Sequence, residues 1–343
     1  MVLITAQKQP LMKKILALPF LIFAAPVLAD HPSIAFGNDA SGPIVTIAPS
    51  FMPANAWGFG VRREIIQNDS FSDQQLINYA NQGIEDVHSV DKITTTSLSA
   101  AYGVSDAFTL SARLPYIERR NIRAGEVEDG EVEAHRHGNS AGMGDLLMMG
   151  QYRLLDIGTA KTGILFGIKA PTGKTDDKDD HGQRFETEFQ PGSGSWDFLL
   201  GASAGHSVAG LNYYANVLYY KTTEGSQSTE IGDALNYNLA MSYRLNSDQG
   251  PSHHHHPGTA DHVDFLWDAV VELNGETRRK NKIAGHSEDN SGGTTVFLSP
   301  GVRMTAGKLG GFVSVGLPVI ENQNGKQTDI NSRIMAGVSL AFD

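Results

Sequence analysis

Histidines give the sequence its clearest chemical signal, a run of four imidazoles followed closely by a fifth. They are His253, His254, His255, His256 and His262. Neutral imidazole is a ligand for zinc, copper or nickel, and a His-rich tract binds such ions without a rigid site. Flanking prolines at 251 and 257 place the tract in a loop. We therefore predict weak capture of Zn, Cu or Ni by this loop, with a solvated polar loop as the alternative and with no cofactor required.

A second histidine pair, His135 and His137, follows the acidic stretch 126–133 and is a weaker candidate for cation binding. Two serines, Ser140 and Ser203, occupy the centre of a G-x-S-x-G motif. That motif positions a nucleophile only at a sharp strand-to-helix turn. The first match precedes an expected strand and the second lies within one, so we predict no catalytic residues and no enzyme.

A partial phosphate-binding motif is also present at residues 173–175, which read Gly-Lys-Thr. The preceding glycine, Gly167, is one residue too distant for a P-loop, and the segment leads from a strand into a polar loop. We therefore expect no nucleotide binding.

The composition restricts both the partners and the compartment. The chain has 343 residues, with 27 basic and 38 acidic side chains and a net charge of −11. This charge argues against a nucleic-acid partner, which selects a basic face. Cysteine is absent, which excludes disulfides and thiolate metal sites. Beyond the N-terminus no run of about 18 apolar residues predicts a membrane helix, but a β-barrel hides its apolar surface in every second residue.

The N-terminus has the pattern of an export signal. Lys13 and Lys14 precede an apolar stretch at 15–28, and small residues at 27–29 predict cleavage before Asp30. We assign residues 1–29 to a signal peptide, with a buried N-terminal helix as the alternative. Met12 is a second candidate for the start of translation. Cleavage leaves 24 basic and 38 acidic residues, a net charge of −14.

The remaining chain alternates between apolar and polar residues with a period of two. In residues 235–245 and 263–274, one face is almost wholly apolar. Residues two apart share a face of a strand, and these strands are about ten to thirteen residues long, a length that suits a tilted membrane strand. We therefore expect Leu239 and Val271 to face lipid, and Asn238 and Val270 to face a lumen.

The same pattern predicts an all-β fold, a transmembrane antiparallel up-and-down barrel of about twelve strands. The expected strands are 55–66, 92–104, 107–118, 142–155, 161–170, 195–207, 210–223, 232–245, 263–275, 293–305, 309–320 and 330–342. Short turns alternate with long polar loops, as in outer-membrane barrels. One connection, the His-rich loop 246–262, is long where a short periplasmic turn is expected. A helix is predicted over 72–82, with Ser72 as its N-cap.

These elements divide the mature chain into a proline-rich segment, 30–54, and a barrel, 55–343. The segment is not a convincing strand, and we expect it in the periplasm or in the lumen. A soluble sandwich also alternates, but the signal, the strand lengths and the turn asymmetry favour the outer membrane of a Gram-negative bacterium. An aromatic girdle is expected from Trp57, Trp196, Tyr213, Tyr219, Tyr237 and Phe342.

Several segments together resemble a known family. They read GMGDLLMMGQYRLLD (142–156), GIKAPTGK (167–174), QPGSGSWDFLLG (190–201), GDALNYNLAMSYRL (232–245), LSPGVRM (298–304), GLPVI (316–320) and RIMAGVSLAF (333–342). In this order they resemble the outer-membrane "meta-pathway of phenol degradation" family, whose members are described as transporters. The resemblance implies a barrel for uptake or efflux of small, often hydrophobic, molecules and supplies no catalytic residues. Asp343 departs from it, because such barrels usually end on an aromatic residue.

The faces opposite the apolar ones carry the residues expected to line the lumen. They are Arg62, Glu64, Arg113, Asp145, Arg153, Lys169, Asp197, Arg244, Asp264, Asp268, Glu272, Arg303 and Arg333. Eight strands give a filled barrel and sixteen an open pore, so twelve predict a narrow or gated passage, with a plugged barrel as the alternative. The expected partners are outer-membrane lipid and a small solute. The sequence leaves open the identity of the solute, the direction of transport and the oligomeric state.

Overall fold

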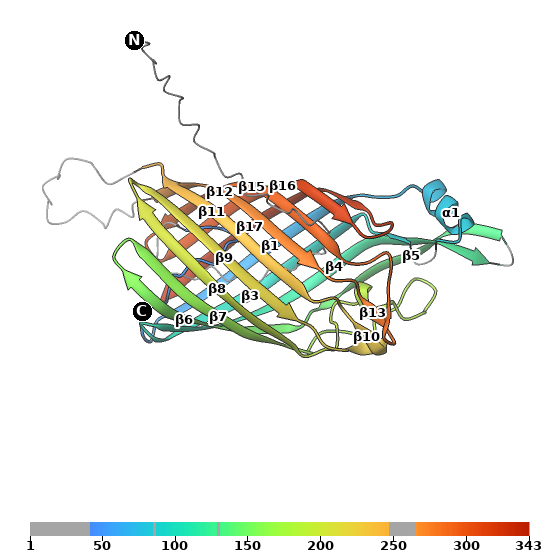
Figure 1. Ribbon diagram of the computed structural model, residues 1–343, viewed down its shortest axis with the longest axis horizontal. Helices are drawn as coiled ribbons and strands as arrows, with labels where there is room; N and C mark the ends of the chain where they lie inside the picture. The colour runs from blue at the N-terminus through green and yellow to red at the C-terminus, as the bar shows by residue number, and fades with distance from the viewer. Residues whose placement is uncertain (1–41, 85–86, 129–130, 247–264, 343) are drawn as a thin grey trace, which may run out of the picture.

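The computed structural model describes residues 42–84, 87–128, 131–246 and 265–342. Twelve long antiparallel strands form a closed, tilted barrel (Figure 1). They are β1 (Trp57–Asp69), β3 (Lys92–Ser105), β4 (Phe108–Glu128), β6 (Leu146–Ile157), β7 (Ala160–Ala170), β8 (Asp197–Val208), β9 (Leu211–Lys221), β11 (Ala234–Arg244), β12 (Phe265–Arg278), β15 (Gly293–Ala306), β16 (Leu309–Gln323) and β17 (Asp329–Phe342). The twelve-stranded barrel predicted from the sequence is confirmed.

Closure depends on pairing between the first and last strands. β1 pairs with β17 in a register that runs from Trp57 opposite Phe342 to Asp69 opposite Asp329. Every long strand of the described residues thereby has a neighbour on each side, so none of these strands is an open edge of the sheet in lipid. The C-terminus lies at one end of the barrel, and the helix and long connections lie at the other, which we call the outer end (Figure 1).

Several short helices and strands lie in the connections at the outer end. The predicted helix is confirmed as α1 (Asp73–Asn81), because Ser72 and Gln75 form a reciprocal capping box at its N-terminus. The shorter elements are β2 (His88–Ser89), η1 (Thr187–Phe189), η2 (Ser226–Ser228), β10 (Thr229–Glu230), β13 (Lys282–Ile283) and β14 (His286–Ser287). Among the described residues, no helix is long and apolar enough to span a membrane.

One expectation is wrong. The long polar connection expected at 119–141 is largely strand, because β4 continues to Glu128 and pairs with β5 (Glu131–Met143) as a hairpin beyond the barrel (Figure 1). The strand predicted from residue 142 begins later, at Leu146, because Gly144 and Asp145 separate the end of β5 from the start of β6. Alternation alone missed this hairpin because most of its residues are polar, so no regular apolar face marks its two strands.

The outward face of the barrel is apolar, as the alternation predicts. Leu239 is 58% exposed and Val271 42% exposed, whereas the adjacent Asn238 and Val270 are buried inside. Five of the six girdle aromatics, all except Tyr237, are exposed on this face; they are Trp57, Trp196, Tyr213, Tyr219 and Phe342. The apolar outer face therefore meets the hydrocarbon of the bilayer.

Replacing Leu239 by Arg is expected to destabilise the barrel by about 2–4 kcal/mol, since the residue faces lipid in mid-strand. Leu239→Met, which stays apolar, is the control and should be nearly neutral. Urea unfolding in lipid vesicles measures both. An Arg variant as stable as the Met variant would show that this face does not contact lipid.

Candidate functional site

An N-terminal segment lies inside the barrel and crosses its lumen. Residues 42–52, which we call the plug, are almost all buried. Their backbone amides are held by side chains of the wall. The carboxylate of Glu272 on β12 accepts hydrogen bonds from the amides of Ile44, Val45 and Thr46, at 2.9 to 3.2 Å. One buried carboxylate thus anchors three consecutive amides, which compensates its own removal from water.

Further contacts follow the plug towards the opposite wall. Asn216 on β9 accepts from the Ile47 amide at 2.8 Å, and Gln151 on β6 donates to the Ala48 carbonyl at 2.6 Å. Thr109 on β4 accepts from the Met52 amide at 2.9 Å. The plug therefore extends from β12 across to β4 and β6 before it enters β1.

Apolar packing and small residues complete the fit. Ile47 belongs to a buried cluster with Leu147, Met149, Leu165, Leu199 and Leu218. Three strand glycines leave room where the plug passes. A Cβ added at Gly163, Gly205 or Gly301 would lie only 2.5 to 3.1 Å from Phe51, Pro49 or Ile44. The inner part of the lumen is therefore filled by the chain's own N-terminal segment.

The charged residues predicted for the lumen form compact groups on its wall. Lys169 donates to Asp197 at 2.5 Å and lies 3.3 Å from Asp145. Asp145 also accepts from the amides of Gly173 and Ser193, both at 2.9 Å. These contacts fasten the connection between β7 and β8 to the inside of the barrel.

A second group is centred on Arg333, which is 0% exposed. Its guanidinium donates to Asn274 at 2.8 Å, lies 3.8 Å from Glu64, and stacks over the ring of Phe297 at 4.2 Å. Arg62 lies 3.8 Å from the same carboxylate. A cation so fully enclosed is stable only with such partners.

The other predicted lumen residues lie in the same wall. Arg244 pairs with the buried Asp268 at 2.7 Å, and Arg153 lies over the Phe51 ring of the plug at 4.8 Å. Arg113 lines the cavity described below, and Arg303 lies against Gly42. Asp264 lies outside the described residues.

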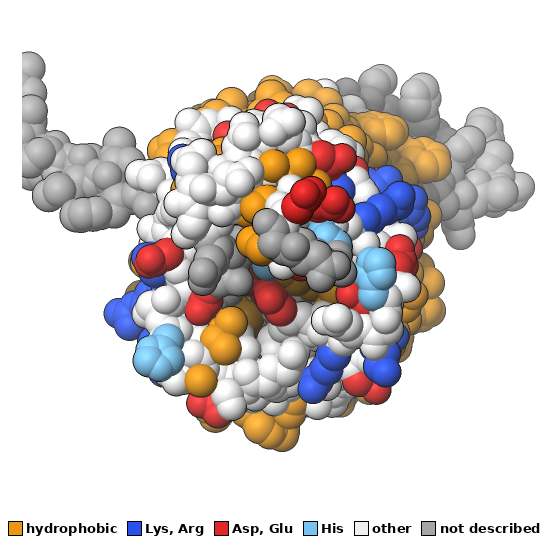
Figure 2. All heavy atoms as spheres, turned by 90° about the vertical axis from the view of Figure 1, so that its right-hand side faces the viewer, with side chains coloured by type: hydrophobic (Ala, Val, Ile, Leu, Met, Phe, Trp, Pro, Cys, Tyr) orange, Lys and Arg blue, Asp and Glu red, His pale blue; other side chains and the backbone are white. Residues whose placement is uncertain are grey.

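Beyond the plug, the outer part of the lumen contains a cavity of about 280 Å³. Viewed from the outer end, the molecule is hollowed near its centre, with acidic and histidine side chains around the hollow (Figure 2). The cavity lining combines apolar residues with charged ones. The apolar set includes Val90, Ile117, Leu147, Phe189 and Ile330, and the charged set includes Arg113, Arg119, Asp145, Lys169, Glu188 and Asp197.

The connection between β7 and β8, residues 171–196, forms one wall of this cavity because it folds inward. Arg119 donates to the carbonyls of Phe189 and Gln190 at 3.3 and 3.2 Å. Ser140 donates to the Phe189 carbonyl at 2.6 Å. The Phe189 ring packs in a buried cluster with strand residues such as Ile117 and Ile330. The outer mouth is thus narrowed by a connection that polar and apolar contacts hold in place.

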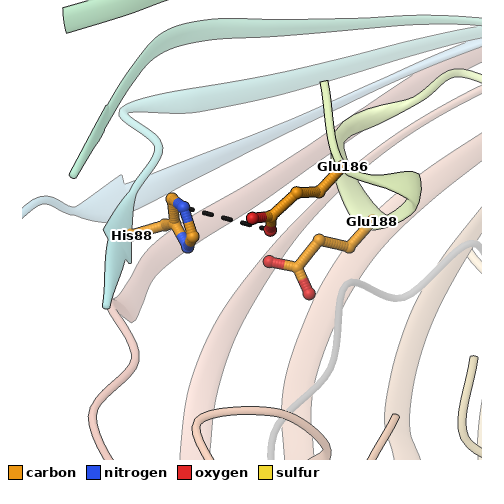
Figure 3. A group of neighbouring side chains, drawn as sticks. All are labelled: His88, Glu186 and Glu188. Atoms are coloured by element: carbon orange, nitrogen blue, oxygen red, sulfur yellow. Dashed lines mark ion pairs between the residues drawn. The ribbon is translucent and has the colours of Figure 1, made fainter. Parts of the chain in front are cut away.

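Three possible metal ligands meet on this inward connection. The ligand atoms of His88, Glu186 and Glu188 lie within 4.8 Å of one another. His88 comes from β2, and both glutamates come from residues 171–196 and point towards it (Figure 3). Burial raises the pKa of Glu188 to about 6; attraction to His88 and Arg119 opposes the rise, and repulsion from Glu186 adds to it. Sequence reasoning missed this group because its members are about a hundred residues apart.

The histidine signals seen in the sequence have different outcomes. The tract of His253, His254, His255, His256 and His262 lies outside the described residues, so its metal binding stays a prediction. His137 lies between two carboxylates, 3.0 Å from Glu126 and 3.4 Å from Asp179. Ser203 is buried inside the barrel, whereas His206 on the same strand is exposed outside.

The fold is that of known outer-membrane proteins. The COG4313 outer membrane channel from Pseudomonas putida F1 matches with a TM-score of 0.55 and 17% identity, over 89% of this chain and 98% of that one. The NanC porin (TM-score 0.44, 8% identity, 82% and 98% coverage) and the toluene transporter TbuX of Ralstonia pickettii (0.42, 8%, 87% and 92%) also match. No curated protein sequence matches the chain.

A closed barrel with an apolar outer face is the architecture of the bacterial outer membrane, and the protein is accordingly an outer-membrane β-barrel. A family match extends over residues 81–317, more than two thirds of the sequence, and agrees with the resemblance seen in its motifs. The chain belongs to the family described as "Putative MetA-pathway of phenol degradation".

Proposed function

We propose that the protein is a channel that carries small solutes through its lumen across the outer membrane. The observation that carries this proposal is a cavity of about 280 Å³ inside a closed barrel, with a plug directly beneath it. The family description, which refers to phenol degradation, gives independent support.

The cavity lining favours a small solute with both an apolar body and a polar group. Val90, Ile117 and Leu147 offer apolar contacts, while Arg113 and Lys169 place positive charge on the cavity lining. Ligand sites of this mixed kind fix orientation by a few polar groups and gain affinity from apolar burial. We therefore expect substituted monoaromatic solutes such as phenol or benzoate rather than sugars.

The plug acts as the gate in this proposal. Its contacts with the wall are hydrogen bonds and apolar packing, all of them non-covalent and therefore reversible. A shift of the plug away from Glu272 and Asn216 would join the outer cavity to the inner end of the barrel. Transport then depends on how often the plug leaves the lumen.

Flux measurements test this function directly. The purified protein is placed in liposomes, and swelling is followed with phenol, benzoate, arabinose and sucrose as solutes, alongside conductance in planar bilayers. We expect flux of the aromatic solutes above that of empty liposomes and little flux of sucrose. Absence of any solute flux, even after removal of the plug, would reject the channel.

An enzymatic role has little support in the geometry, and we propose that the barrel is not a hydrolase. The hydroxyl of Ser140 donates to a backbone carbonyl, which is a structural role. Ser203 and His206 lie on opposite sides of the barrel wall, whereas a nucleophile needs its base within hydrogen-bond reach. Hydrolysis of an ester panel, lost in a Ser140→Ala or Ser203→Ala variant, would overturn this view.

A further inference from the structure

The side chains of His88, Glu186 and Glu188 converge at the outer mouth without a direct bond among them. His88 Nε2 lies 4.0 Å from Glu186 Oε2, which is an ion-pair distance and too long for a hydrogen bond. The ligand atoms of all three side chains lie within 4.8 Å of one another, so two carboxylates share this space with one imidazole. Such a group gains stability from a cation placed between its members.

Neighbouring residues hold these side chains in place. The amide of Asn281, in the connection between β12 and β15, donates to Glu188 at 3.2 Å. The ring of His88 packs edge-on against Phe189 at a centroid distance of 4.8 Å, and its side chain is 15% exposed. A ligand set oriented in this way by surrounding contacts is typical of protein metal sites.

We propose that His88, Glu186 and Glu188 form a binding site for a divalent transition-metal ion of the zinc class at the outer mouth. One imidazole and two carboxylates suit Zn²⁺, whereas Ca²⁺ and Mg²⁺ prefer oxygen ligands alone. In a tetrahedral zinc site, neighbouring ligand atoms are about 3.3 Å apart. From separations within 4.8 Å, shifts of less than about 1 Å per side chain complete that geometry.

Because of the position of the site, a bound ion would link two connections of the barrel. His88 belongs to the connection between β1 and β3, and both glutamates belong to the connection between β7 and β8. The barrel order places β4 and β6 between these strand pairs. A bound ion therefore ties two separate connections together across the mouth and holds residues 171–196 inward. Its effect on conduction rests on the proposed channel function, whereas the binding itself does not.

Zinc binding is measured first, by competition with a chromophoric chelator on the detergent-solubilised protein, prepared without an affinity tag. The histidines at 253–256 and 262 are changed to Asn throughout, so that the tract adds no binding. We expect one zinc ion to bind per chain. His88→Asn or Glu188→Gln should lower the zinc affinity at least about tenfold, because losing a ligand lowers metal affinity at least as much as losing a residue that orients a ligand. His286→Asn is the matched control, an exposed histidine at the same end of the barrel.

Conductance is then recorded with and without Zn²⁺. We expect zinc to lower the conductance of the tract-free protein but not that of its Glu186→Gln variant, which changes a half-exposed side chain and should fold normally. Heat-modifiable migration on gels verifies folding of each variant. Zinc affinity unchanged in the His88, Glu186 and Glu188 variants would overturn the site. Zinc binding that depends on these residues but leaves conductance unchanged would support the site and would overturn the idea that the ion holds residues 171–196 inward.

Discussion

Deleting residues 42–52 is expected to raise the conductance of the barrel about tenfold or more. A twelve-stranded barrel has a lumen wider than that of a filled eight-stranded barrel and narrower than that of an open sixteen-stranded pore, so it conducts once the plug is gone. The plug occupies the inner lumen through Glu272, Asn216 and the apolar cluster around Ile47. Removal of the plug should therefore join the outer cavity to the inner end of the barrel. Planar-bilayer recordings on the deletion variant and on the full chain measure the difference.

A second variant separates the loss of the plug from shortening of the chain. Ile47→Asp places a charge inside an apolar cluster, so it should loosen the plug and raise conductance in the same direction. Leu239→Met, on the lipid face, should leave conductance as it is. Equal conductance in the deletion variant and the full chain would mean that the plug does not obstruct the pathway.

Replacing Arg333 by Met is expected to destabilise the barrel by up to about 3–5 kcal/mol, since breaking a buried ion pair leaves its carboxylate with less compensation. Among the described residues, Glu64 then keeps only Arg62, at 3.8 Å, and the Oδ1 of Asn274 keeps only the hydroxyl of Ser299, at 2.8 Å. Urea unfolding in lipid vesicles gives the free energy of unfolding for both proteins.

Arg120→Met serves as the matched control for this change. Arg120 forms an exposed pair with Glu118 at 3.9 Å, so its loss should cost less than about 1 kcal/mol. If the Arg333 and Arg120 variants lose stability equally, then the lumen around Arg333 is solvated and the buried network described above is incorrect.

The barrel was predictable from the sequence because lipid and lumen impose opposite polarity on alternating residues. Leu239 and Asn238 are neighbours in sequence, yet one is exposed and the other buried, as the period of two requires. The ion pairs of the lumen were predictable only as a set of inward-facing charges. Which carboxylate meets which cation, such as Asp197 with Lys169, depends on strand register that alternation does not specify.

The connections escaped prediction for a different physical reason. The inward fold of residues 171–196 depends on long-range contacts such as Arg119 with the Phe189 carbonyl. The position of residues 42–52 likewise depends on Glu272, more than two hundred residues away. Neither contact has a local sequence pattern, so the plug could be expected only in the periplasm or the lumen, and the site at His88 could not be expected at all.

Whether the plug is a movable gate is tested most directly by locking it. The chain has no native cysteine, so Pro49→Cys with Gly205→Cys introduces a single pair. A Cβ at 205 lies 3.1 Å from Pro49 Cγ, which is compatible with the Cβ separation of about 3.5–4.5 Å in a disulfide. We predict that the oxidised pair conducts less than the native chain and that a reducing agent restores conductance. An oxidised, fully cross-linked barrel that conducts as well as the reduced one would contradict the gate.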